Sequence, residues 1–69
     1  MTFGQKVKNR RRELGMTQVE LALETRLSQG YISQLERDGF NPTAPVIMRL
    51  ASALKLSIDC LLLDDRKAG

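Results

Sequence analysis

Four positions between Gln29 and Gln34 have the residue types and the spacing to read the edges of DNA bases. Gln29, Gly30, Ser33 and Gln34 recur at intervals that put them on one side of a helix, and none is charged. A glutamine amide can pair bidentately with adenine in the major groove, and small residues let a helix approach closely. The pattern predicts base recognition, with a plain solvent-exposed polar face as the alternative.

The residues that most enzymes use for catalysis are missing or badly placed. The chain has no histidine and one cysteine, Cys60, so neither a His-based triad nor a His/Cys metal site can form. Asp64 and Asp65 are neighbouring carboxylates in a polar tail, without the fixed geometry that acid–base catalysis needs. We expect no enzyme, no metal and no cofactor. Cys60 is expected to pack as a small apolar residue, with redox sensing as the less favoured role.

The stretch from Thr17 to Glu36 predicts two short helices joined by a tight turn. Thr17 and Glu20 have the spacing of a capping box, and Ser28 can cap the second helix. Residues that give each helix one buried edge fall at helical spacing: Leu21, Ala22, Thr25, Leu27, Ile32 and Leu35. The turn would therefore hold the second helix with its polar face outward.

Three further helices are predicted around this pair. The first covers about residues 3–14 and stops at Gly15, because glycine adopts the left-handed conformation without steric cost. The second helix of the pair, which is the third along the chain at about 29–37, is expected to end at Gly39. A fourth runs from about 44 to 54 with Thr43 as its cap, and Ser57 caps the last. The chain is thus expected to be an all-α domain of five helices at 1–63, followed by a polar tail at 64–69.

The composition describes a small folded protein with a basic surface. The 69 residues are 42% hydrophobic and 28% charged, with a net charge of +3, which favours a polyanionic partner. Much of the positive charge lies in the first helix, where Arg10 and Arg12 are candidates for phosphate contact and a solvated face is the alternative. A single cysteine, no signal peptide and no membrane-length apolar run predict a cytoplasmic location.

Taken in order, these features resemble the phage-repressor and Cro-like helix-turn-helix family, also called the Xre family. The resemblance covers about residues 3–62. It rests on residues at family spacing: Thr17-Gln18 with Leu21-Ala22, Ser28 with Ile32 and Leu35-Glu36, Asn41-Pro42, Leu50-Ala51-Ser52-Ala53-Leu54, and Leu56-Ser57-Ile58-Asp59 with Leu61-Leu62. It implies a lambda-repressor-like fold in which the second and third helices form the motif. It also implies a transcriptional repressor that binds a palindromic operator as a dimer, with the third helix in the major groove.

The resemblance also suggests roles for individual residues. Gln18 and Gln29 match two glutamines that hydrogen-bond to each other, so that Gln18 touches a phosphate while Gln29 reads a base. Asn41 lies in a segment that contacts the DNA backbone. Arg11 and Glu36 match a buried ion pair between the first and third helices, and truncating either partner is expected to cost about 3 kcal/mol or more. Further groove-facing positions are Gly30, Ser33 and Gln34.

Three positions have more than one interpretation. Arg26 stands in the turn where many relatives have glycine, and a left-handed conformation there would cost about 1 kcal/mol. A phosphate contact from Arg26 could offset this cost. Alternatively, the turn has a different conformation from that of relatives with glycine. Gly30 stands where some relatives have a base-reading side chain, so it either permits close approach or reads nothing. Tyr31 can reach a phosphate with its hydroxyl or simply pack its ring.

Two other functions are compatible with the sequence. Antitoxins of this family bind both a toxin and DNA, and exposed apolar residues could serve such a protein partner: Val19, Leu23, Val46 and Met48. The chain could also be the N-terminal DNA-binding domain of a larger repressor. For a homodimer, the expected interface lies around the last helix, with the candidates Ile58, Cys60, Leu61 and Leu63.

Overall fold

The computed structural model describes residues 1–62, and within that range it contains helices and no strand. The helices are α1 (Phe3–Glu13), α2 (Gln18–Thr25), α3 (Gln29–Glu36), α4 (Ala44–Leu54) and α5 (Ile58–Leu62). The predicted all-α class is confirmed, and α1 and α3 each end one residue earlier than expected. Leu63, the domain boundary there and the tail at 64–69 lie outside the described residues.

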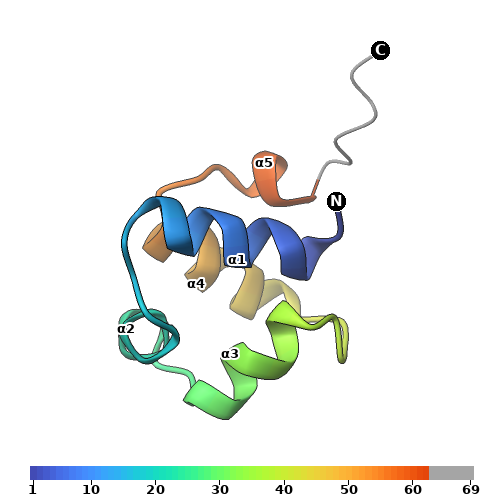
Figure 1. Cartoon of the computed structure of the whole chain (residues 1–69). Coiled ribbons are helices and arrows are strands. Elements are labelled where there is room, and N and C mark those ends of the chain that lie inside the picture. The colour runs from blue at the N-terminus through green and yellow to red at the C-terminus, as the bar shows by residue number, and fades with distance from the viewer. Residues whose placement is uncertain (63–69) are drawn as a thin grey trace.

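Helix α1 lies across the middle of the molecule, between α5 on one side and α3 on the other (Figure 1). Helix α2 packs against both α3 and α4. Side chains from all the helices meet between them, and those with almost no exposed surface are Val7, Leu21, Ile32, Leu35, Leu50, Leu54 and Leu61. One side of α3 contributes to this core, and its other side forms the lower edge of the molecule in Figure 1.

Side-chain caps begin α2 and α3 as predicted. The Thr17 hydroxyl accepts from the Glu20 backbone N–H at 3.0 Å, and the Glu20 carboxylate accepts from the Thr17 N–H at 2.8 Å. The Ser28 hydroxyl accepts from the Tyr31 N–H at 3.0 Å. The prediction for α4 was wrong in one respect, because Thr43 is the N-cap but its hydroxyl makes no capping hydrogen bond. Pro45 removes one of the N–H groups that such a cap usually binds.

The end of α3 also differs from the prediction. Asp38, and not Gly39, adopts the left-handed conformation, with φ 59°. Its carboxylate accepts from the Gly4 N–H at 2.9 Å and from the Thr2 hydroxyl at 2.6 Å, at the N-terminus of α1. Aspartate tolerates the left-handed region better than most residues, and a helix N-terminus stabilises an anion. Asp38 therefore ties the end of α3 to the start of α1.

The backbones of α1 and α3 approach each other closely at Gly4. A Cβ atom at this position would collide with the Leu35 carbonyl oxygen and would lie 2.7 Å from Asp38 Oδ1. A side chain at Gly4 would push the two helices apart. Glycine here thus sets how deeply α3 sits against α1, and so how far its outer face projects.

Candidate nucleic-acid interface

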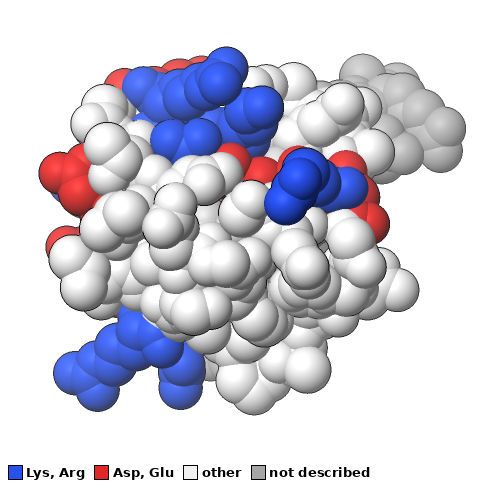
Figure 2. Space-filling view, turned by 60° about the horizontal axis from the view of Figure 1, so that its bottom comes forward, with Lys and Arg blue, Asp and Glu red and all other residues white. Residues whose placement is uncertain are grey.

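The outer face of α3 is uncharged and open. Gln29, Gly30 and Gln34 are exposed and Ser33 is half-buried, while the buried residues of α3 face the core. Figure 2, which brings the bottom of Figure 1 forward, shows a broad surface without charged side chains, with Lys and Arg groups above and below it and some Asp and Glu groups at its left and right. The four residues predicted to read bases therefore share one accessible face, with positive charge on two of its borders.

Nothing within the described fold requires glycine at position 30. A Cβ atom on Gly30 would meet no atom within 4 Å, and its backbone is helical. Glycine inside a helix costs about 0.5–1 kcal/mol relative to alanine. The described fold therefore gives no structural reason for Gly30, and close approach of a DNA base to this position stays a prediction.

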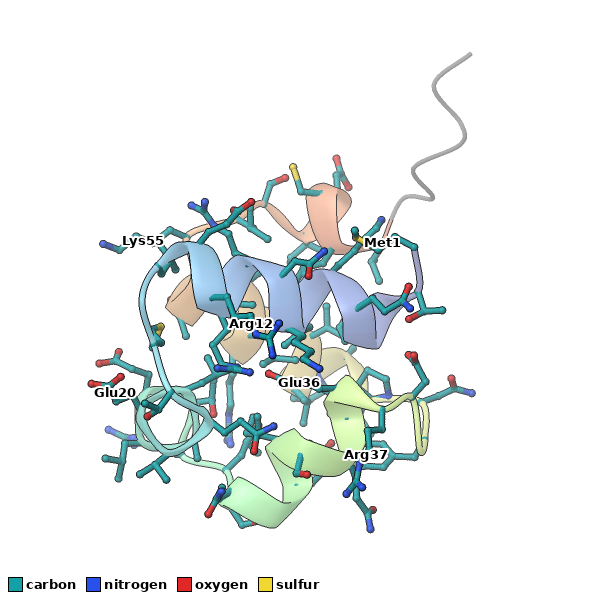
Figure 3. All side chains as sticks on the ribbon, in the orientation of Figure 1. Met1, Arg12, Glu20, Glu36, Arg37 and Lys55 are labelled. Carbon is teal, nitrogen blue, oxygen red and sulfur yellow. The ribbon has the colours of Figure 1, made fainter. Side chains whose placement is uncertain are left out.

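Arg37 is a further candidate for contact with a DNA phosphate, and it was not among the residues predicted from the sequence. Its guanidinium Nη2 donates to the Ser33 hydroxyl at 3.1 Å, so the side chain lies back along α3 and brings a cation to the edge of the uncharged face. Figure 3 shows Arg37 extending away from the core below α3. The signal was available in the sequence, because residues four apart are neighbours on a helix surface.

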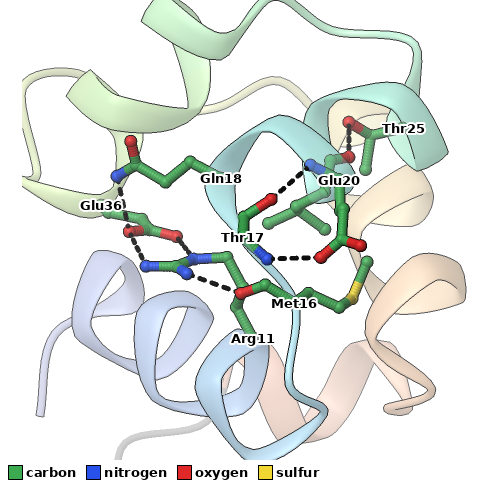
Figure 4. A network of polar contacts seen from close by, with 8 residues as sticks. Arg11, Met16, Thr17, Gln18, Glu20, Thr25 and Glu36 are labelled. Carbon is green, nitrogen blue, oxygen red and sulfur yellow. Dashed lines mark hydrogen bonds and ion pairs between the residues drawn. The ribbon is translucent and has the colours of Figure 1, made fainter.

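Arg11 and Glu36 form a buried ion pair between α1 and α3 (Figure 4). Arg11 Nε donates to Glu36 Oε2 at 2.6 Å and Nη2 donates to Oε1 at 3.1 Å, which is bidentate geometry. A third donor of Arg11, Nη1, binds the Met16 carbonyl at 2.8 Å. Only 9% of the Arg11 side chain and 2% of the Glu36 side chain are exposed, so the pair belongs to the interior.

Gln18 does not pair with Gln29 as the resemblance suggested. Its Nε2 donates to Glu36 Oε1 at 3.1 Å, and the Gln29 side chain makes no hydrogen bond within residues 1–62. The charged carboxylate of Glu36 is the stronger acceptor, and it lies within reach of the first residue of α2. Gln18 is thus held against α3, and Gln29 is left free to meet another molecule.

The arginines predicted to contact phosphate lie on two different sides of α1. Arg12 is exposed and extends toward the α3 side (Figure 3), and Lys8, one turn earlier, shares its side of the helix. The prediction that Arg10 contacts a phosphate needs correction. Its Nε donates to the Leu54 carbonyl at 2.9 Å and its Nη1 binds Glu13 at 3.2 Å. Arg10 therefore satisfies the C-terminus of α4, on the side away from α3.

The remaining phosphate candidates lie at the two ends of α3. Arg26 is exposed in the turn before α3 and adopts φ 62° and ψ 34°, the left-handed conformation considered from the sequence. Asn41 is exposed in the loop after α3. Tyr31 is half-buried. Its ring centroid lies 4.7 Å from that of Phe40, and the two ring planes are inclined at 58°, which favours the packing interpretation. Its hydroxyl makes no hydrogen bond within the described chain.

The candidates for a dimer interface include both exposed and buried residues. Ile58, 38% exposed, and Cys60 are accessible on α5. Leu61 was a wrong choice, because only 1% of its surface is exposed and it completes the core between α5 and the other helices. Leu62, with 56% exposed, is the accessible neighbour instead. Leu63 lies outside the described residues.

Within residues 1–62 there is no group of three His, Cys, Asp or Glu side chains that could hold a metal ion. None of the described helices has the length and apolar character needed to cross a membrane.

The family model described as helix-turn-helix matches residues 7–59, which contain the whole of α2, α3 and α4. The chain belongs to the helix-turn-helix family. The family resemblance predicted from its residues is thereby confirmed. Among sequence relatives, the immunity repressor protein of Bacillus phage phi105 is 37% identical over 62 residues, covering 90% of this chain and 43% of that repressor. The chain spans about half the length of the curated relatives it matches.

Solved structures agree with this helix-turn-helix assignment. The P22 c2 repressor, in complex with a synthetic operator, has a TM-score of 0.85 at 32% identity, covering 90% of this chain and 94% of that one. SinR of Bacillus subtilis, in complex with DNA, has a TM-score of 0.86 at 30% identity, covering 90% of this chain and 100% of that one. The match to a repressor-like helix-turn-helix fold is therefore close over nearly the whole chain.

Proposed function

We propose that this helix-turn-helix protein binds DNA in a sequence-specific way and regulates transcription, as a repressor. The observation that supports this best is the uncharged, amide-bearing outer face of α3, exposed between cationic side chains. Uncharged amides and small residues suit base edges, whereas Lys and Arg at the border suit phosphates. The relatives solved with DNA have the same fold at about a third sequence identity, which adds support.

In this proposal α3 enters the major groove and the surrounding residues hold the backbone. Gln29, Ser33 and Gln34 would read base edges, with Gly30 allowing close contact. Each good bidentate pair discriminates against the wrong base by about 1–3 kcal/mol. The phosphate contacts would come from residues that flank this face: Lys8, Arg12, Gln18, Arg26, Arg37 and Asn41.

We further propose that the protein acts as a homodimer on a palindromic operator, in the cytoplasm, without a cofactor. Ile58 and Leu62 expose apolar surface on α5, and pairing two copies there would remove it from water. Two-fold pairing would present two α3 helices to successive major grooves, about one helical turn apart. Repression would follow from occupying a promoter.

The test is selection of binders from a random-sequence duplex library at roughly physiological salt. The proposal predicts enrichment of a palindrome whose half-sites are about 10 base pairs apart. A single short enriched site would keep the DNA-binding function but contradict the dimer. If no sequence were enriched, the proposed function would be wrong.

The second candidate function is a protein-binding module of the antitoxin type. It is favoured by the apolar side chains on the outer side of α2, where 75% of Leu23 and 49% of Val19 are exposed, and by Met48 on α4, 59% exposed. Val46 is half-buried and offers less surface. The chain could also serve as the DNA-binding part of a larger repressor. A selection that recovers no site would favour the protein-binding module.

A further inference from the structure

Glu36 accepts hydrogen bonds from two other helices at one buried point (Figure 4). Arg11 of α1 supplies two donors, at 2.6 and 3.1 Å, and Gln18 of α2 supplies a third, at 3.1 Å. Arg11 also holds the Met16 carbonyl, in the linker that leads into α2. The start of α2 is therefore fixed to α3, the helix proposed to read bases, through a single carboxylate.

Gln18 is the first residue of α2, and only one hydrogen of its amide group is used by Glu36. The second amide hydrogen remains available at the N-terminus of α2. The Glu20 N–H there is capped by Thr17, but the N–H groups of Gln18 and Val19 are left to accommodate a phosphate oxygen. A glutamine that is already ordered loses less side-chain entropy when it binds. The contact with Glu36 thus prepares Gln18 to donate to a phosphate.

The charge of Glu36 would normally oppose a phosphate at this place. The bidentate guanidinium of Arg11 compensates that charge within the protein interior. Glu36 can then accept from the Gln18 amide without leaving its own charge uncompensated behind the phosphate.

We propose that Glu36 is a positioning residue for DNA binding, which holds the Gln18 amide ready for one operator phosphate at a fixed distance from the α3 face. This inference rests on the proposed DNA-binding function. A merely structural ion pair would stabilise the fold without affecting any particular phosphate. The two roles can therefore be separated by measuring binding phosphate by phosphate.

The first step identifies the phosphate. Each phosphate of the operator recovered by selection is replaced in turn by an uncharged methylphosphonate. One replacement should weaken wild-type binding about tenfold, as expected for the loss of one hydrogen bond to a charged group, and should leave the binding of Gln18→Ala unchanged. If no replacement distinguished the wild type from Gln18→Ala, Gln18 would have no phosphate to be positioned for, and the inference would fail.

The second step removes the acceptor while keeping the site filled. Arg11→Met/Glu36→Met replaces the ion pair with apolar side chains, a change that is often neutral for stability at buried pairs. Arg11→Met/Glu36→Gln is the matched control, because glutamine has nearly the shape of methionine but restores an acceptor for the Gln18 amide. Both variants lose the contact with Met16 equally.

The positioning role predicts that the Met/Met variant binds the unmodified operator about tenfold more weakly and no longer responds to that methylphosphonate. The Met/Gln variant should respond as the wild type does. A Met/Met variant that folds and still responds fully would overturn the inference, while the DNA-binding function would stand. Failure of the selection itself would instead reject the proposed function.

A measurement on the wild type covers the case in which neither variant folds. Relaxation of side-chain amide ¹⁵N nuclei reports how rigidly each glutamine is held. Gln29 and Gln34 are the controls, since their side chains make no hydrogen bond within residues 1–62. Free of DNA, Gln18 should have an order parameter near that of the backbone, about 0.85, and the controls should fall below about 0.6. Equal mobility of all three would contradict the positioning role.

Discussion

Gln29 extends from the first turn of α3, and its amide is not engaged by any other described residue. Gln29→Ala should leave the fold intact, because the side chain is exposed. It should lower the preference for the selected sequence by about 1–3 kcal/mol while leaving the dependence on salt unchanged, since no phosphate contact is lost. Competition binding with single-base variants measures this. A uniform loss of affinity for all sequences would contradict the assigned role.

Arg10 and Arg12 provide a matched pair on the same helix. Arg12→Ala should reduce the slope of log K against log salt by about 0.9, because one phosphate contact is lost. Arg10→Ala should leave that slope nearly unchanged, because Arg10 already binds the Leu54 carbonyl and Glu13. Its effect should instead appear as lower stability in urea unfolding. Equal effects of the two substitutions on the slope would show that the sides of α1 have been assigned wrongly.

Residue types and helical spacing were enough to predict which side of α3 is exposed. They were not enough to separate Arg10 from Arg12, since both lie in one basic run and the bond from Arg10 to the Leu54 carbonyl depends on how α4 packs. The same limit applies to Gln18. Whether its amide turns to Gln29 or to Glu36 depends on the separation of α2 and α3, which periodicity does not report.

At the scale of elements, the contact between α1 and α3 depends on Gly4. Gly4→Ala should destabilise the protein by about 2 kcal/mol, because the new methyl group would overlap the backbone of α3. Gly30→Ala is the control, with open space around the Cβ position. It should raise stability by about 0.5–1 kcal/mol yet weaken operator binding. Urea unfolding of both variants tests this, and equal shifts would contradict the packing argument.

The turn between α2 and α3 gives a second test at this scale. Arg26 is held at φ 62°, a conformation that glycine adopts without strain. Arg26→Gly should therefore be more stable than Arg26→Ala by about 1 kcal/mol, since both lack the charge and only alanine keeps the strain. The two variants should share the same reduced salt slope if Arg26 touches a phosphate. Equal stabilities would mean that the left-handed conformation carries no cost here.

The helices themselves were predictable because their signals are local. The capping box of Thr17 and Glu20 and the cap at Ser28 act within one turn, and the sequence shows them directly. The end of α3 was not predictable in the same way. Asp38 adopts a left-handed conformation because its carboxylate reaches the N-terminus of α1, a contact between residues more than thirty positions apart.

At the scale of the whole molecule, the distribution of charge matters more than its sum. A net charge of +3 is modest, but the uncharged face of α3 is bordered by cations on two sides (Figure 2). Affinity for any duplex should come from that border and should fall steeply with salt, whereas selectivity should come from the face between. The same separation explains why composition alone indicated a polyanion but could not indicate sequence specificity.

Sequence recognition by the exposed face of α3 underlies the proposed function. The most direct measurement compares the Kd of the wild-type protein for the selected duplex with its Kd for a scrambled duplex of the same composition, at roughly physiological salt. We expect a preference of about 10³-fold or more for the selected duplex, most of which should be lost in Gln29→Ala/Gln34→Ala. Equal affinity for the two duplexes would contradict it, and would reduce α3 and its border to a non-specific basic surface.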